Sequence, residues 1–317
     1  MFTYLSFRYV IGTPLVAAAC FLHALTRPHP YLRLFLFMIL GVYGTLIEMN
    51  AVIISHLTAI PKDWNSLLSL GRIVLTVGLS WSGIIYSTIM VAEAAFATLS
   101  PWTRYLFAGF VMLNLDFALD PLTSKVGEGE LEWIKIPCVN LFSWFVIPTV
   151  FYFFYTIDWP PFPRGVPYIY HIGVIEDTVT PLRYMYWGLG VIPLSLGAAL
   201  PLITYFKQFV CSYALTNFTV SMSIAFLLSL VTCLMALRAR VQLAADHWSD
   251  AFPSLVLVGV PLAYIVVAAL VTESASRLYR LTLMCTASSP MVVILLCTAL
   301  PLVKRKGKET EPQPKEE

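Results

Sequence analysis

Residues 114–144 read NLDFALDPLTSKVGEGELEWIKIPCVNLFSW, and they predict an apolar helix that carries two carboxyl groups, a polar loop, and a second apolar helix. Asp116 and Asp120 are four residues apart, so both project from one face of the first helix. Pro121 disfavours helical geometry at Asp120, which predicts that the helix stops there with the pair in its last turn. The negative end of the helix dipole and burial among apolar groups both oppose ionisation at that place. One carboxyl group of the pair is therefore a candidate proton donor. The alternative is an ordinary helix end with its charges among the lipid headgroups.

The composition of the chain indicates a membrane protein. Of its 317 residues, 58% are hydrophobic and only 12% are charged, and the mean hydropathy is +0.77. Successive apolar stretches approach or exceed the ~20 residues that cross a bilayer, and lipid offers no hydrogen-bond partners to irregular backbone. We therefore predict an all-α polytopic membrane protein, multi-pass in the lipid bilayer of a cell inner membrane. Its bundle of about nine transmembrane helices is predicted at residues 8–26, 33–59, 70–99, 102–120, 134–157, 183–206, 212–238, 251–273 and 277–303.

A proline-rich segment, WPPFPRG at residues 159–165, divides the chain. Ahead of it lie the helices with polar residues in their interiors, and behind it lie helices that are mostly apolar. The charged end of the chain contains two prolines and is predicted to be disordered. The predicted regions are a five-helix membrane region carrying the polar motifs at 1–157, a loop at 158–182, a four-helix membrane region at 183–303 and the tail at 304–317.

Charge and potential metal ligands argue against two classes of function. The formal net charge is only +2, and the sequence carries no signature of nucleic-acid binding, so no nucleic-acid partner is expected. The five histidines and six cysteines are dispersed along the chain, which does not match the ligand spacing of a metal centre. We expect neither a metal nor another cofactor.

Glu48 is predicted near the middle of the second helix, on a stripe that also holds the small residues Gly41 and Thr45. Small residues on one stripe indicate close packing against another helix. An ionisable group at this depth costs at least ~2.5–3.5 kcal/mol, so it should face the bundle interior and be protonated or partnered. Glu48 is therefore a candidate functional residue, with structural hydrogen bonding to a neighbouring helix as the alternative.

Aromatic and amide side chains supply further candidates. Trp81 and Tyr86 of the third helix are candidates for lining a cavity, although aromatic residues in membrane helices also serve in packing. Glu93, near the end of the same helix, is expected to reach water. Asn140 and Trp144 are four residues apart and share one face of the fifth helix. A buried asparagine must be hydrogen-bonded, so this one is predicted either to orient a carboxyl group or a water molecule, or to hold two helices together.

In order and spacing, these residues resemble a family of integral membrane proteins of carotenoid biosynthesis whose characterised members are carotenoid hydratases of the CruF type. The resemblance extends over about residues 33–157. It is most specific in the Asp-x-x-x-Asp-Pro element and the Trp, Pro, Asn and Trp that follow it. The residues that carry it are Glu48, Trp81, Tyr86, Asp116, Asp120, Pro121, Trp133, Pro137, Asn140 and Trp144.

The resemblance implies addition of water to the terminal double bond of an acyclic carotenoid, a hydrophobic polyene, with a tertiary alcohol as the product. Such a reaction needs an acid that protonates carbon, a positioned water molecule, and a dry site in which a tertiary carbocation survives. Asp116 or Asp120 would supply the proton, and the other aspartate or Glu48 would accept one from the attacking water. Aromatic ring faces would stabilise the cation by up to ~2 kcal/mol. The implied substrate-binding residues are Trp81, Tyr86, Trp133, Asn140 and Trp144.

Two other functions remain open from the sequence. Asn114-x-Asp116-x-x-x-Asp120 and Asp246-x-x-x-Asp250 loosely resemble the two Asp-rich motifs with which membrane prenyltransferases hold magnesium diphosphate. The predicted helices place these two motifs on opposite sides of the membrane. A non-enzymatic carrier or scaffold is the other alternative, although the chain shows no internal repeat and no pair of broken helices typical of transporters.

Overall fold

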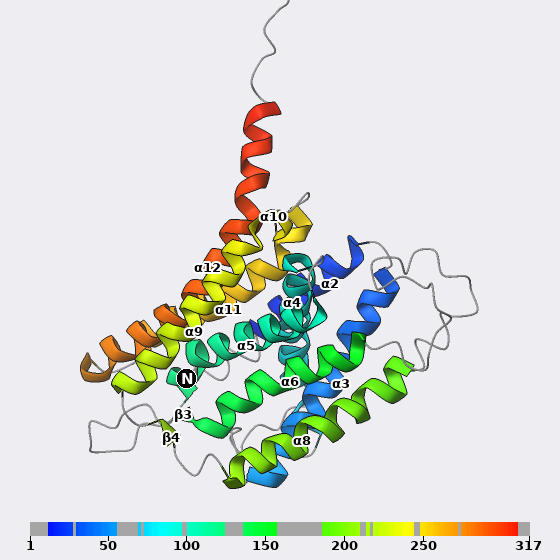
Figure 1. The fold of residues 1–317 in the computed structure, drawn as a ribbon, viewed down its shortest axis with the longest axis vertical. Coiled ribbons are helices and arrows are strands. Elements are labelled where there is room, and N and C mark those ends of the chain that lie inside the picture. The colour runs from blue at the N-terminus through cyan, green and yellow to red at the C-terminus, as the bar shows by residue number, and fades with distance from the viewer. Residues whose placement is uncertain are drawn as a thin grey trace, which may run out of the picture.

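The structure is a computed structural model that describes residues 12–27, 30–55, 69–70, 73–96, 100–123, 136–156, 186–209, 214–215, 218–243, 248–271 and 274–309. Within these residues, nine helices of 13 residues or more form a bundle (Figure 1). They are α2 (Thr13–Leu25), α3 (Pro30–Ser55), α4 (Leu75–Ala95), α5 (Pro101–Thr123), α6 (Cys138–Thr156), α8 (Ile192–Phe209), α9 (Phe218–Arg238), α11 (Phe252–Val271) and α12 (Ser274–Glu309).

Short elements connect several of these helices. Two antiparallel pairs of two-residue strands lie near helix starts. They are β1 (Ser69–Leu70) with β2 (Ile73–Val74), and β3 (Ile136–Pro137) with β4 (Ala214–Leu215). The second pair holds the start of α6 close to the start of α9, because its strands come just before those helices. A turn of π-helix leads into α8, and two short helices separate α9 from α11. These elements are η3 (Trp187–Val191), α10 (Arg240–Leu243) and η4 (Trp248–Ala251).

Each of the nine predicted helices corresponds to one observed helix, and the predicted all-α membrane fold is confirmed. In the described part of the chain, seven helices are long and apolar enough to cross a membrane, as in an integral multi-pass protein. α2 falls short of that length with 13 residues. α5 carries charged residues among its apolar ones, and it is stable because other helices enclose it, so that Arg104, Asn114 and Asp116 are all buried. The kind of membrane stays a prediction.

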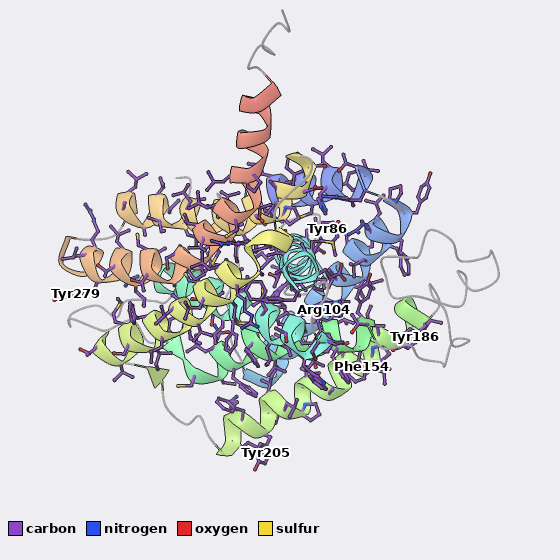
Figure 2. All side chains as sticks on the ribbon, turned by 45° about the horizontal axis from the view of Figure 1, so that its top comes forward. Tyr86, Arg104, Phe154, Tyr186, Tyr205 and Tyr279 are labelled. Carbon is purple, nitrogen blue, oxygen red and sulfur yellow. The ribbon has the colours of Figure 1, made fainter. Side chains whose placement is uncertain are left out.

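α4 lies at the centre of the bundle. It packs against α2, α3, α5 and α11, and Figure 2 shows it end-on among the other helices. Of its apolar span, 89% is buried inside the bundle, against 22% for α8, which runs along the outer edge (Figure 1). The polar side chains of α4 and of the adjacent α5 are therefore shielded from both water and lipid.

The contact between α3 and α4 is close because small residues line it. A Cβ atom at Gly78 would overlap Thr45 Oγ1 and would approach the Gly41 carbonyl oxygen to 2.7 Å. The predicted packing stripe through Gly41 and Thr45 is thus confirmed. This close approach brings Glu48 of α3 within hydrogen-bond reach of Trp81 in α4.

The end of α5 differs from the prediction that the helix stops at Asp120. The helix continues through Pro121 to Thr123, so Asp116 lies well before the last turn and its predicted position was wrong. A proline in a helix removes one i→i−4 hydrogen bond and its ring crowds the preceding turn, which disfavours the helix locally without ending it here. The argument from the helix dipole therefore does not apply to Asp116.

The C-terminal helices pack in the same bundle as the N-terminal ones. α11 packs against α2 and α4, and α12 packs against α5 and α9. Arg27, just after α2, forms an ion pair with Asp250 of η4. α12 continues to Glu309, into the segment predicted as a disordered tail, and projects beyond the other helices (Figure 1). The loop at 158–182 lies outside the described residues, and the division of the chain into two membrane regions stays a prediction.

Candidate functional site

Asp116 is among the most deeply buried polar residues of the bundle. It lies in the interior of α5, and none of its side chain is exposed. The Nδ2 atom of Asn140 donates to its Oδ1 atom at 3.0 Å and to its Oδ2 atom at 3.3 Å. Asn140 reaches this position because it lies in the first turn of α6, which packs along α5. The amide therefore fixes the orientation of the Asp116 carboxyl group.

Trp144 lies one turn after Asn140 in α6 and contacts Trp81 of α4. The ring centroids are 4.8 Å apart, and the ring planes meet at 40°. The Nε1 atom of Trp81 in turn donates a hydrogen bond of 2.8 Å to Oε1 of Glu48 in α3. We call Asp116, Asn140, Trp144, Trp81 and Glu48 the polar row. Four helices contribute to it, so residues distant in the sequence meet in one place.

In the polar row, one carboxyl group is bonded to Asn140 of α6, and the other is bonded to Trp81, whose ring contacts that of Trp144 one turn further along α6. The carboxyl group of Asp116 is completely buried, whereas Glu48 is half-buried. Carboxyl groups can donate or accept protons, and indole faces attract a nearby cation. Because the N–H group of Trp81 is bonded to Glu48, its ring can offer a ligand only its face. The arrangement suits acid–base chemistry on an apolar molecule.

Two of the predicted site residues are not placed by the described part of the chain. The backbone of Asp120 lies one turn beyond Asp116 in α5, but its side chain lies outside the described part. Trp133 lies outside it altogether. The roles of both residues stay predictions.

Tyr86, the remaining predicted site residue, lies apart from the polar row. Its hydroxyl group is 2.8 Å from Nδ1 of His23 in α2, and the two rings meet edge to face. Arg27 Nε donates to His23 Nε2 at 3.2 Å, so Nε2 is the acceptor and Nδ1 carries the proton that is donated to Tyr86. Tyr86 follows Trp81 by five residues, which turns it to a different side of α4.

The surroundings of Tyr86 include charged groups that the sequence pattern did not identify as a site. Glu93 of α4 and Arg104 of α5 are both buried, and the charges of Arg33 and Arg104 act on Glu93. The expectation that Glu93 reaches water was therefore wrong, because the starts of α3 and α5 cover the end of α4. The sequence did contain one indication that Glu93 and Tyr86 lie together. Glu93 follows Tyr86 by seven residues and therefore shares its helix face. Figure 2 shows Tyr86 and Arg104 inside the bundle, whereas Tyr205 and Tyr279 lie at its outer edge.

Asn114, part of the first Asp-rich motif, points away from Asp116. The two residues are two positions apart in α5 and so face nearly opposite directions. Asn114 donates from Nδ2 to Oγ1 of Thr232 at 2.9 Å and accepts a bond of 2.9 Å from Oγ of Ser229, both in α9. Its amide thus links α5 to α9, which does not favour a shared magnesium site with Asp116.

Residues 66–174 match the family model described as carotenoid biosynthesis protein. This segment, about a third of the chain, contains Trp81, Asp116, Asn140 and Trp144 of the polar row, and Glu48 precedes it. The resemblance to membrane proteins of carotenoid biosynthesis is confirmed for this segment. The chain matches no curated protein and no solved structure. The narrower resemblance to carotenoid hydratases stays a prediction.

Proposed function

Because the segment that holds most of the polar row matches carotenoid biosynthesis proteins, we propose that this chain is a membrane enzyme that adds water to the terminal double bond of an acyclic carotenoid. The observation that carries the proposal is the polar row. A fully buried carboxyl group is held by an amide of α6, and one turn along the same helix a tryptophan contacts a second tryptophan that is bonded to another carboxyl group. Hydration of an isolated alkene involves no redox change, so an acid, a base and a dry surrounding are sufficient.

In the proposed reaction, Asp116 transfers its proton to the less substituted carbon of the terminal double bond. The π electron pair forms the new C–H bond, and positive charge develops on the neighbouring tertiary carbon. A water oxygen then attacks this carbon, and one water proton passes to a carboxylate, either Glu48 or Asp120. The substrate gains one H₂O in total, so atoms and electrons balance without another reactant.

The two tryptophans have a role in this scheme that polar side chains cannot fill. Trp81 and Trp144 are only 7% and 8% exposed, so bulk water is kept away from the carbocation. Their ring faces stabilise a cation by up to ~2 kcal/mol when water is excluded. Glu48 is only half-buried, and its carboxylate is the candidate to accept the water proton, which must return to Asp116 before the next turnover.

Expression in a host that accumulates an acyclic carotenoid tests the proposal. We expect a new pigment heavier by one water molecule, detected by chromatography and mass spectrometry. Its visible absorption should be nearly unchanged, because the terminal double bond is isolated from the conjugated chain. Unchanged pigment with several acyclic carotenoids, with the protein verified in the membrane, would overturn the proposal in favour of a carrier or a different enzyme.

A further inference from the structure

A groove with a volume of about 440 Å³ lies between α2, α4 and α11. Its inner wall includes Ile84 of α4 with Val256 and Tyr264 of α11, all of them buried. Its rim includes Leu15 of α2 and Leu255 of α11, which are 66% and 43% exposed. The groove therefore opens on the outer surface of the bundle, where a membrane protein meets lipid chains.

The shape of the groove fits one extended chain. Its lining follows α11 from Phe252 to Tyr264, a rise of about 18 Å along the helix. An elongated groove of this kind suits an extended hydrocarbon chain better than a globular ligand.

The chemistry of the lining favours an apolar occupant. Most of the lining residues are aliphatic or aromatic, and the hydroxyl groups of Thr13 and Ser80 are bonded to each other at 2.6 Å. Water is held in a cavity only where it finds two or more polar partners, so an apolar groove of this kind binds it poorly. An apolar chain that enters from the bilayer therefore does not have to displace tightly bound water.

The groove and the polar row share a turn of α4. Ser80 lines the groove, and the next residue, Trp81, belongs to the polar row. We propose that the groove binds the polyene chain of an acyclic carotenoid taken from the bilayer, beside the residues that act on its end group. The identity of the chain rests on the proposed function. A conjugated polyene is already extended and rigid, so it loses less conformational freedom in a narrow groove than a flexible acyl chain does.

Gly259 of α11 allows the groove to be blocked without disturbing the helices. It belongs to the lining, and a Cβ atom built on it meets no other atom within 4 Å. A leucine side chain at this position can therefore occupy the groove. Gly197 of α8 has equally open surroundings and lies outside the groove lining, so Gly197→Leu is a matched control. Gly259→Ala adds only a methyl group and therefore fills less of the groove.

The measured quantity is the acyclic carotene that co-purifies with the full chain from a carotene-accumulating host. Visible absorption gives the pigment per protein, and induced circular dichroism in the same band reports an asymmetric binding site. We expect Gly259→Leu to lower both signals by roughly tenfold or more, since it fills space that the chain requires. Gly259→Ala should lower them less, and Gly197→Leu should leave them unchanged. Equal melting temperatures establish that the variants are folded.

Wild-type pigment content in Gly259→Leu would overturn the inference. So would an equal loss in Gly197→Leu, or a phospholipid in place of carotene in the purified wild-type protein. The proposed function is judged separately, by the mass of the pigment. Pigment binding that depends on Gly259 but leaves the pigment mass unchanged would refute hydration and keep the groove assignment. If the Gly259→Leu protein binds pigment normally and forms the hydrated product, the groove assignment is refuted and the hydration proposal is kept.

Discussion

Asp116 is buried completely and is held by the amide of Asn140, so its chemistry can be tested with one substitution. Asparagine at this position keeps the size and an oxygen that accepts a hydrogen bond, but it cannot deliver a proton to carbon. Asp116→Asn should therefore lower the hydration rate by ~10²–10⁴ in isolated membranes, with the protein level near that of the wild type. Glu48→Gln is the comparison variant, with a smaller loss expected. Near-full activity of Asp116→Asn would falsify the assignment of the acid.

The hydrogen bond from Trp81 to Glu48 provides a second test at the level of single residues. Phenylalanine keeps an aromatic face against Trp144 but lacks the indole N–H group, so Trp81→Phe removes the bond of 2.8 Å. If this bond orients Glu48 as the base, the rate loss from Trp81→Phe should largely disappear in a Glu48→Gln background. The expected coupling in a double-mutant cycle is about 1–3 kcal/mol. Strictly additive losses would show that the bond does not serve the reaction.

Among the helices, the contact between α3 and α4 sets the position of Glu48 relative to Trp81. A side chain at Gly78 would overlap Thr45, so Gly78→Val should push the two helices apart. Overpacking of this kind costs about 1–3 kcal/mol and should lower the midpoint of thermal unfolding in detergent, together with activity. Gly197→Val is the control, because its surroundings are open. Equal midpoints for the two variants would contradict the packing argument.

The positions of the helices could be predicted because apolar stretches of bilayer length leave few other conformations. Local periodicity also identified shared faces, such as that of Asn140 and Trp144. Spacing along the chain does not say which neighbouring helix a face meets, so the contact between Trp81 and Trp144 and the separate position of Tyr86 required the structure. The helix end predicted at Asp120 was wrong because the proline rule describes a local preference, and the helix continues to Thr123 in spite of it.

For the whole molecule, the proposed chemistry depends on carboxyl groups in a dry bundle interior and not on a divalent cation. Excess EDTA should therefore leave the hydration rate of the purified protein unchanged. A magnesium-dependent prenyltransferase, the alternative drawn from the Asp-rich motifs, would lose its activity under this treatment and regain it when Mg²⁺ is added. Such a loss and recovery would contradict the hydratase proposal.

The length of α12 has a practical consequence for imaging this protein. Its 36 residues, which include Pro290 and Pro301, correspond to roughly 54 Å measured along the bent helix at about 1.5 Å per residue, longer than the ~30 Å of a bilayer's hydrocarbon core. Figure 1 shows its last turns standing clear of the bundle. Small membrane proteins are difficult to align in electron cryomicroscopy, because a detergent micelle hides most of their outline. A rigid protein fused in helical continuity with the end of α12 would stand outside the micelle as a fiducial and distinguish the two sides of the membrane in each particle.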